Sequence, residues 1–399
     1  MAAADRPGRP RLPAVRPLRS LPQLTTFALS FQIPKGSDIP RSHEPVSSTG
    51  RRRFLKGTAG ALAVPTAAGL LGALARPAYA DGTGLPDFDP VPAASAGPAP
   101  NADGYHVGRI DGHLYWVTDS YYQAMFLTTT RGVVLVDAPP TIGHNLQRAI
   151  NDVTRANGRP SKVTHLVYSH SHADHIGAAG IFGHDTVRIA HAETARLLAR
   201  AGDPNRPLPT VTFRDKYRLR VGGETLDLAY HGPNHSPDNI FVHAPEYDTL
   251  MLVDVLYPGW VPFKGLAVSQ DIPDWIKAQH IAMDYPWRTF VGGHLGRLGT
   301  RADGTLQIQY MDDLDTSTRS AITSVDPSPY FAKYGAQGNS WAIFKTFLDA
   351  VADTAAAPVA AKYAGVLAAA DVFTKDNAWT LLESLRIDTG VLGPFSVHP

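Results

Sequence analysis

The sequence predicts an α/β fold followed by a helical C-terminal extension. Strand-like segments and a helical stretch succeed one another between residues 105 and 168. A loop that holds three histidines and an aspartate begins where the last of these strands ends, and α/β proteins usually place their chemistry at such strand ends. Beyond residue 300, apolar residues recur at helical spacing. Together, these observations place the expected functional site in the α/β part.

The chain of 399 residues opens with a basic leader, residues 1–80. Residues 1–56 hold eleven of the 37 Lys and Arg but only three of the 36 Asp and Glu, so the remaining chain is acidic. An acidic body cannot neutralise phosphates by bulk charge, which argues against nucleic acid as a partner. The apolar fraction of 44% is sufficient for a sizeable core. The chain contains no cysteine, so any metal must be held by nitrogen and oxygen.

The leader is typical of a secretory signal. A charged stretch at residues 50–56 precedes an apolar run at residues 57–75 and an Ala-Tyr-Ala site at residues 78–80. Its arginines, followed by Phe-Leu-Lys, resemble a twin-arginine signal. We expect twin-arginine export to the periplasm, cell envelope or medium, and a mature chain that begins near Asp81. A membrane anchor is the alternative, but Gly and Pro65 interrupt the apolar run, so we expect no stable membrane insertion after signal removal.

Ordered structure is expected to begin near Tyr105. Residues 81–104 are rich in Pro, Ala, Gly and Asp, which predicts a flexible linker. An Asp-Gly turn at residues 111–112 predicts a hairpin between the first two strands. A helix is predicted from about residue 142 to 157, and a buried strand at 163–168. The other predicted strands are 105–110, 114–118, 124–129 and 133–136.

The loop after the buried strand reads Ser-His-Ser-His-Ala-Asp-His. His170 and His172 are two positions apart, so in an extended segment they face the same way. Asp174 and His175 lie on the next turn, where residues 176–180 indicate a helix start, and they could converge on a neighbouring ion. A lone histidine is usually structural, but this spacing is typical of a metal site. Imidazole and carboxylate ligands suit Zn²⁺ and would also accept Fe or Mn.

This HxHxDH motif resembles that of the metallo-β-lactamase superfamily of hydrolases, and further elements follow in the family's order. His235, in a Gly-Pro-Asn-His stretch, resembles the second histidine element. Asp254 follows an apolar strand, where family members often carry a bridging aspartate. His294, after Val-Gly-Gly, resembles the last ligand element. Asp137, at the end of a Val-Leu-Val run, resembles the first and mainly structural element. The resemblance covers residues 132–296.

The resemblance implies a four-layer αβ/βα sandwich over residues 105–300, with a helical extension at residues 301–399. It also implies two zinc ions at the edge between the sheets and a dinuclear zinc hydrolase. A water shared by the ions would lose a proton, and the resulting hydroxide would attack a small ester, lactone or thioester. Asp174 would both bind metal and orient the attacking group. The implied ligands are His170, His172 and His235 for one ion, Asp174, His175 and His294 for the other, and Asp254 as the bridge.

Two alternatives to this function stay open. The absence of cysteine and the presence of His175 resemble the all-histidine zinc β-lactamases, as well as lactonases and glyoxalase II thioesterases. Asp254 favours lactonases, thioesterases and esterases. A different class is a non-hydrolytic iron oxidoreductase of the same fold. A flavodiiron reductase would need a flavin domain, and the last hundred residues show no Gly-rich phosphate loop.

Other polar and aromatic side chains near the motifs have either a structural or a functional interpretation. Some loop residues are hydrogen-bond partners for ligand imidazoles or ordinary turn residues, namely Ser169, Ser171, Asn234 and Asn239. Four histidines outside the motif positions are taken as structural or exposed, namely His165, His184, His191 and His231. Five aromatic residues form either a substrate wall or ordinary packing, namely Tyr121, Tyr122, Tyr257, Trp260 and Phe263.

Residues 301–399 predict a helical extension. Apolar side chains recur at helical spacing from Trp341 to Val351 and again from Ala378 to Leu385. An Ala-rich stretch at residues 355–370, broken by Pro358, predicts another helix. The extension either packs on the sandwich, pairs subunits of a homo-oligomer, or caps the active site.

Overall fold

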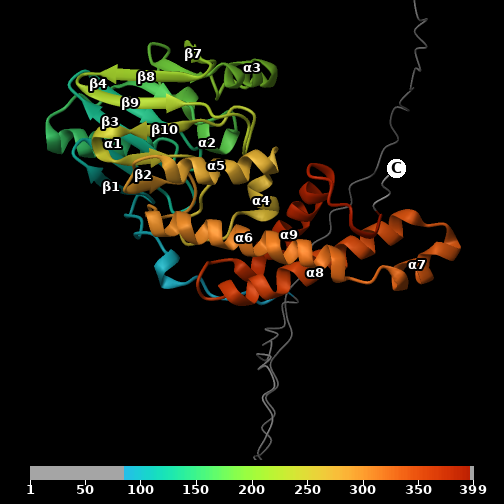
Figure 1. Ribbon diagram of the computed structural model, residues 1–399. Helices are drawn as coiled ribbons and strands as arrows, with labels where there is room; N and C mark the ends of the chain where they lie inside the picture. Colours follow the sequence, from blue (N-terminus) through green and yellow to red (C-terminus); the bar gives the residue numbers. More distant parts are fainter. Residues whose placement is uncertain (1–84, 396–399) are drawn as a thin grey trace, which may run out of the picture. The chain divides into compact units, whose positions relative to one another are not determined.

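Two β-sheets pack face to face in the α/β part of the structure (Figure 1). This computed structural model describes residues 85–395, which all belong to one compact unit of the chain. The signal expected within residues 1–80 lies outside the described residues. Two sheets, covering helices and a helical C-terminal region confirm the predicted fold class.

The first sheet has seven strands that lie in the order of the chain. Its first four strands run antiparallel, and β4 to β7 run parallel. The predicted strands between residues 105 and 168 are confirmed to within one residue at each end, and so is the hairpin at residues 111–112, where Gly112 has a φ of +46°. The strands are β1 (His106–Asp111), β2 (Leu114–Thr118), β3 (Gln123–Thr129), β4 (Gly132–Val136), β5 (Val163–Val167), β6 (Val187–His191) and β7 (Val211–Phe213).

The second sheet has five strands in the order β12-β11-β10-β9-β8, antiparallel except for the parallel pair β11 and β12. Successive side chains of a strand face opposite sides of its sheet. In β10, Val242 therefore packs between the sheets, whereas Phe241 packs on the outer face. The strands are β8 (Lys216–Val221), β9 (Glu224–Ala229), β10 (Phe241–Ala244), β11 (Thr249–Met251) and β12 (Thr289–Val291).

Helices cover the outer face of each sheet and complete four layers. α1 (Asn145–Asn157) and α3 (Ala192–Ala201) pack against the first sheet, and α5 (Ile272–Asp284) packs against the second. α1 begins three residues later than predicted because Gly143 takes a left-handed conformation, with a φ of +51°. Short 3₁₀ turns lie at Ala93–Ser95, Ala179–Ile181, Pro245–Tyr247, Gly335–Gln337 and Gly393–Phe395.

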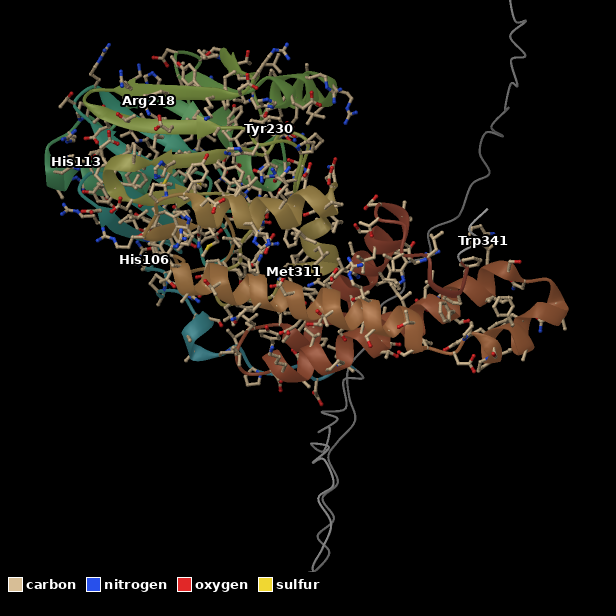
Figure 2. All side chains as sticks on the ribbon, in the orientation of Figure 1. His106, His113, Arg218, Tyr230, Met311 and Trp341 are labelled. Atoms are coloured by element: carbon tan, nitrogen blue, oxygen red, sulfur yellow. The ribbon has the colours of Figure 1, made fainter. Side chains whose placement is uncertain are left out.

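The C-terminal helices form a bundle that shares a hydrophobic core with the outer face of the second sheet. α8 packs along α6 and α9, and both α6 and α9 contact α5, which covers the second sheet. Met311 of α6 is buried in this core, whereas Trp341 of α8 is 84% exposed (Figure 2). The helices are α6 (Arg301–Ser324), α7 (Ser328–Tyr334), α8 (Ser340–Tyr363) and α9 (Ala370–Ile387).

The expectation that Pro358 breaks the helix is wrong, because α8 continues through it to Tyr363. Proline removes one backbone hydrogen bond, that of the Thr354 carbonyl. Both residues lie on the exposed side of α8, where water can satisfy this carbonyl. Ala355 and Val359 are buried on the other side, and their packing holds the helix together across the proline.

Residues 85–104 are tethered at several points, whereas their composition predicts a flexible linker. Ser95 is buried, and its hydroxyl donates a hydrogen bond of 2.6 Å to the Gly259 carbonyl. The Asp89 backbone N–H donates to the Asp371 carboxylate at 2.6 Å. Composition alone does not reveal these distant partners. Among the described residues, no helix combines the length and apolarity that crossing a membrane requires.

Candidate metal centre

The seven sequence-predicted ligands all lie in segments that follow strands of the two sheets. His170 and His172 follow β5, and Asp174 and His175 lie on the short helix α2 (Ala173–Ile176). The other three follow strands of the second sheet, namely His235 after β9, Asp254 after β11 and His294 after β12. The sandwich thus brings together side chains that are more than 100 residues apart in the chain.

α2 differs from the helix expected at residues 176–180. It begins at Ala173 and ends at Ile176, so Asp174 and His175 belong to the helix itself. Gly177 lies so close to the Ala173 carbonyl that an added Cβ would approach its oxygen to 2.3 Å. The single turn places Asp174 and His175 beside the histidines that precede it.

The donor atoms form two groups, and within each group they all lie within 4.8 Å of one another. The groups match the two predicted ligand sets, with Asp254 counted in the first. The first group is His170, His172, His235 and Asp254, and the second is Asp174, His175 and His294.

The Asp254 carboxylate joins the two groups. Its Oδ2 lies 3.2 Å from His235 Nε2 and 3.0 Å from His175 Nε2. Its Oδ1 lies 2.7 Å from His294 Nε2. Because one carboxylate lies close to histidines of both groups, Asp254 stands between them.

The spacing of the histidine nitrogens and one unpartnered nitrogen are compatible with a metal site. His172 Nδ1 lies 3.0 Å from His235 Nε2, and His175 Nε2 lies 3.1 Å from His294 Nε2. Zn–N bonds of about 2.0–2.1 Å in a tetrahedral site place ligand nitrogens about 3.4 Å apart. His170 Nε2 is buried without a hydrogen-bond partner, a costly arrangement unless a cation accepts its lone pair. The nitrogen and oxygen donors of the cluster could therefore hold a metal ion.

Burial and mutual repulsion keep part of the cluster neutral. Burial lowers the pKa of His235 to about 4 and that of His170 well below its usual value. Burial alone would also lower the pKa of His175, but the Asp254 and Asp174 carboxylates outweigh it and raise this pKa to about 9. Burial would raise the pKa of Asp254, but the surrounding histidines hold it well below its usual range. At neutral pH, His170 and His235 are therefore neutral imidazoles beside an ionised Asp254 carboxylate, and these are the forms that bind metal.

Loop hydrogen bonds fix the ligands in place. Ser169 Oγ lies 2.9 Å from His170 Nδ1, which leaves His170 Nε2 to face the centre. Asn234 Oδ1 accepts the His235 backbone N–H at 2.7 Å, and Asn239 donates to the Val253 carbonyl at 2.8 Å. Of the predicted polar partners, only Ser169 contacts a ligand imidazole directly in these hydrogen bonds. The asparagines hold backbone instead.

Asp137 holds the start of the loop that carries the HxHxDH motif. It is fully buried, and its Oδ1 accepts the Ser169 backbone N–H at 2.7 Å. Burial raises the pKa of Asp137 to about 6. This contact matches the structural part expected of the first element.

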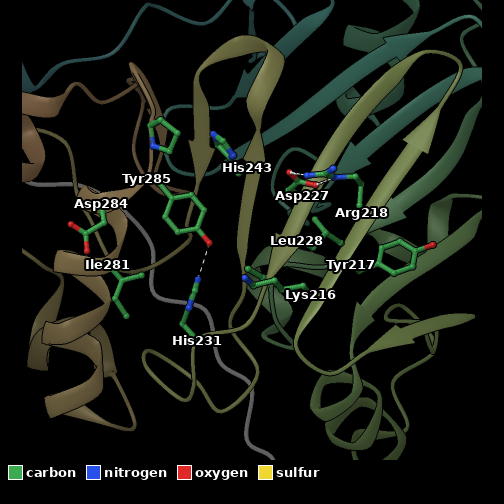
Figure 3. Close-up of a pocket in the computed structure, with 12 residues that line it drawn as sticks. Lys216, Tyr217, Arg218, Asp227, Leu228, His231, His243, Ile281, Asp284 and Tyr285 are labelled. Carbon is green, nitrogen blue, oxygen red and sulfur yellow. Dashed lines mark hydrogen bonds and ion pairs between the residues drawn. The ribbon is translucent and has the colours of Figure 1, made fainter.

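The histidines expected to be structural make contacts outside the seven ligands. His231 Nε2 lies 2.7 Å from the Tyr285 hydroxyl, in a hollow of about 740 Å³ between β8, β9, β10 and α5 (Figure 3). His165 Nδ1 lies 3.0 Å from Thr164 Oγ1. His191 Nε2 lies 2.8 Å from the Arg214 carbonyl. His184 is exposed.

A cavity of about 370 Å³ opens onto the seven-residue cluster. Among the aromatic residues considered from sequence, Trp260 does not line this cavity, because its indole N–H donates to the Ser95 carbonyl at 3.2 Å. Four others do line it, namely Tyr121, Tyr122, Tyr257 and Phe263. Sequence reasoning missed the remaining apolar lining, namely Val261, Ala267, Val268 and Phe373. No local motif marks these residues, since Phe373 lies 119 residues after Asp254 in the chain.

The chain resembles known proteins over about half its length. Residues 117–303 match the family model of the metallo-β-lactamase superfamily. The chain is 26% identical over 197 residues to the 2,4-dinitroanisole O-demethylase subunit alpha of Nocardioides sp. (strain JS1661), over 48% of this chain and 58% of that protein. It is 31% identical over 134 residues to a metallo-β-lactamase type 2 of Bacillus sp. (strain 170), over 32% of this chain and 47% of that protein. The chain thus spans about half the length of these curated relatives.

Solved structures that this chain resembles over part of its length include a metallo-β-lactamase from Pontibacter korlensis. That chain is 22% identical, the TM-score is 0.44, and the match covers 51% of this chain and 97% of that chain.

Proposed function

Residues 117–303 form a metallo-β-lactamase superfamily domain, and from this premise we propose that the chain is a dinuclear zinc hydrolase of a small ester, lactone or thioester. Members of this superfamily are generally metal-dependent hydrolases, and the His/Asp cluster could hold metal. The observation that carries the proposal is the Asp254 carboxylate, which lies within 3.2 Å of histidine nitrogens of both groups.

In this proposal each group of residues has its own task. His170, His172 and His235 would hold one zinc ion, and Asp174, His175 and His294 would hold the other, with Asp254 between the two groups. When bound, two zinc ions would lower the pKa of a shared water towards neutrality and polarise the bond to be cleaved.

Asp174 is the candidate catalytic residue because it faces the cavity. Its side chain is 44% exposed, and its Oδ2 accepts a hydrogen bond from the Tyr122 hydroxyl at 3.4 Å. Tyr122 remains protonated at neutral pH, since burial and the nearby carboxylates raise its pKa to about 12. Asp174 is thereby oriented so that it can accept a hydrogen bond from the attacking water.

The cavity suits a small organic molecule. Its volume of about 370 Å³ lies near the lower end of the range for small-molecule sites. The relative named 2,4-dinitroanisole O-demethylase makes an aryl methyl ether a second candidate substrate, because tyrosine and phenylalanine side chains line the cavity. The relative named as a metallo-β-lactamase keeps a β-lactam as a further candidate.

The test is a substrate panel on zinc-loaded protein, combined with metal analysis. We expect two zinc ions per chain and hydrolysis of an ester, lactone or thioester. Asp174→Asn should abolish hydrolysis with the fold retained, whereas His231→Ala, outside the cavity, should not alter it. Iron in the native preparation and no hydrolysis of any panel member would contradict the proposal and favour an oxidoreductase.

We also propose that the protein is exported by the twin-arginine route, on the strength of the sequence of residues 50–80.

A further inference from the structure

The helical extension holds the segment that leads from Asp254 to the cavity. This segment, residues 255–268, is here called the pocket loop. Gln307 of α6 is buried, and its Nε2 donates to the Val255 carbonyl at 2.7 Å. Gln307 Oε1 accepts the Tyr257 backbone N–H, also at 2.7 Å. One side chain of the extension therefore satisfies the backbone on both sides of Leu256.

A second attachment lies further along the pocket loop, where backbone pairs with backbone. The Ala368 N–H donates to the Gly259 carbonyl at 2.9 Å, and the Ala368 carbonyl accepts the Val261 N–H at 3.1 Å. These bonds form a short parallel bridge between the pocket loop and the segment before α9.

The third attachment is Asn377 of α9, which holds the end of the pocket loop. Asn377 is fully buried, its Oδ1 accepts the Leu266 N–H at 2.8 Å, and its Nδ2 donates to the Pro262 carbonyl at 2.9 Å. Leu266, Ala267 and Val268 take left-handed conformations, with φ values of +52°, +64° and +47°. Such a run is strained for side chains with a Cβ and persists only where the surroundings enforce it. Packing against α9 supplies that enforcement.

The wall built in this way is apolar and partly contributed by α9 itself. Phe263 and Phe373 pack edge to face, with ring centroids 5.2 Å apart and an interplanar angle of 67°. Phe263 is 50% exposed and Val268 is 61% exposed at the cavity. Exposed apolar side chains around a cavity are typical of a ligand site. Of the described residues that line the cavity, none is Lys or Arg. Lys264, which follows Phe263 in the chain, pairs with α9 instead, because its Nζ lies 3.7 Å from Asp376 Oδ1.

We propose that the helical extension selects the substrate. Phe373, with Phe263 and Val268, binds a neutral aromatic or branched aliphatic group of the substrate beside the scissile bond. Asn377 is a positioning residue that holds this wall in shape. An anionic group would be disfavoured against this wall, because the apolar side chains displace water from the anion and offer it neither a hydrogen-bond donor nor a Lys or Arg partner. This inference rests on the proposed hydrolase function for the scissile bond, but the apolar site itself does not depend on it.

The first test compares three methyl esters that differ in one group, followed by acid release from zinc-loaded protein. We expect kcat/KM for methyl phenylacetate to exceed that for the anion monomethyl succinate by at least about tenfold. Phe373→Ala should lower the ratio of kcat/KM for methyl phenylacetate to that for methyl acetate by about tenfold. Trp379→Ala, on the same helix but outside the cavity, should leave the ratio unchanged.

Asn377→Ala should lower the same ratio, because the wall loses its shape. A merely structural loss reduces the amount of active protein and lowers both rates equally, so the ratio separates positioning from stability. Phe373→Leu, which restores an apolar side chain, should recover part of the preference. An unchanged ratio in both Phe373→Ala and Asn377→Ala would overturn the inference.

The second test measures binding of the neutral fluorophore N-phenyl-1-naphthylamine, which requires no turnover. Phe373→Ala should weaken this binding by about tenfold or more, and Trp379→Ala should not. Equal binding by the wild type and Phe373→Ala would refute the apolar site. Binding that depends on Phe373 without hydrolysis of any panel substrate would refute the hydrolase function and leave the apolar site standing. Conversely, Asp174-dependent hydrolysis with a substrate ratio that Phe373→Ala leaves unchanged would support the hydrolase function and refute the apolar site.

Discussion

The Tyr257 hydroxyl donates a hydrogen bond of 3.1 Å to Asp254 Oδ1, the same oxygen that lies 2.7 Å from His294 Nε2. Tyr257 is buried, and burial together with the Asp254 charge raises its pKa well above the usual value, so it remains a donor at neutral pH. This hydrogen bond fixes which carboxylate oxygen faces His294. Tyr257 thus links the cavity wall to Asp254, which lies between the two groups of candidate metal ligands.

Tyr257→Phe removes only that donor. We expect metal affinity or kcat to fall by about 10- to 100-fold, the usual effect of losing a hydrogen bond to a metal ligand. Zinc retention against a competing chelator and kcat on the best substrate measure the two effects. Tyr285→Phe is the matched control, because the Tyr285 hydroxyl bonds His231 outside the cavity (Figure 3). Equal zinc retention and kcat in Tyr257→Phe and wild type would contradict the prediction.

Metal removal should destabilise the folded protein. Without a cation, buried nitrogens such as His170 Nε2 have no partner, and binding to the folded state alone stabilises it by mass action. With free zinc at a hundred times its Kd, the free energy of unfolding should be about 3 kcal/mol higher than in chelator. Thermal unfolding with chelator, and after zinc is restored, measures this difference. Identical curves in both conditions would argue against a zinc site in this cluster.

Export can be tested apart from the fold. The twin-arginine pathway is understood to carry folded proteins, which suits a protein that takes up its metal before it leaves the cytoplasm. Replacing Arg51, Arg52 and Arg53 by lysine should retain the uncleaved chain in the cytoplasm, as cell fractionation would show. Replacing Arg41, upstream of the signal, is the control and should not alter export. Normal export of the triple variant would contradict the prediction.

Part of the candidate metal cluster can be predicted from the sequence because its information is local. His170, His172, Asp174 and His175 follow one strand at fixed spacing, and the strands themselves alternate in a recognisable pattern. The positions of His235, Asp254 and His294 depend on the sandwich, and the resemblance supplied that sandwich. Local spacing and family order together were enough to name all seven residues that the structure brings together.

The pocket loop could not be predicted in the same way. Its conformation depends on buried side chains such as Gln307 and Asn377, each of which contacts residues far away in the chain. In sequence, these are ordinary polar residues within amphipathic helices. The run of left-handed residues around Ala267 carries no signal either, since only Gly265 favours that conformation intrinsically. Tertiary contacts decide this part of the site.

Asp303 links the last part of the α/β fold to α6, and its ionisation should be visible in stability. Its carboxylate accepts two hydrogen bonds from Arg297, at 2.6 and 3.0 Å, and caps α6 together with Thr300. Burial alone would raise the pKa of Asp303, but Arg297 and Thr300 outweigh it and lower this pKa. At pH 7, Asp303→Asn should therefore lower the free energy of unfolding by about 1–3 kcal/mol.

The pH dependence of this stability loss follows from the direction of the pKa shift of Asp303. Because the folded-state pKa of Asp303 lies below the unfolded value of about 3.9, its contribution is fully present above that value. It should be lost as the pH falls from about 4 through the folded-state pKa. Urea unfolding of wild type and Asp303→Asn should show a constant gap from pH 5 to 7 that narrows below about pH 4. Asp315→Asn, in an exposed pair with Arg319 on the same helix, should differ from wild type by less than about 1 kcal/mol throughout. A gap for Asp303→Asn that stays constant down to pH 3 would show that the carboxylate charge does not stabilise the start of α6.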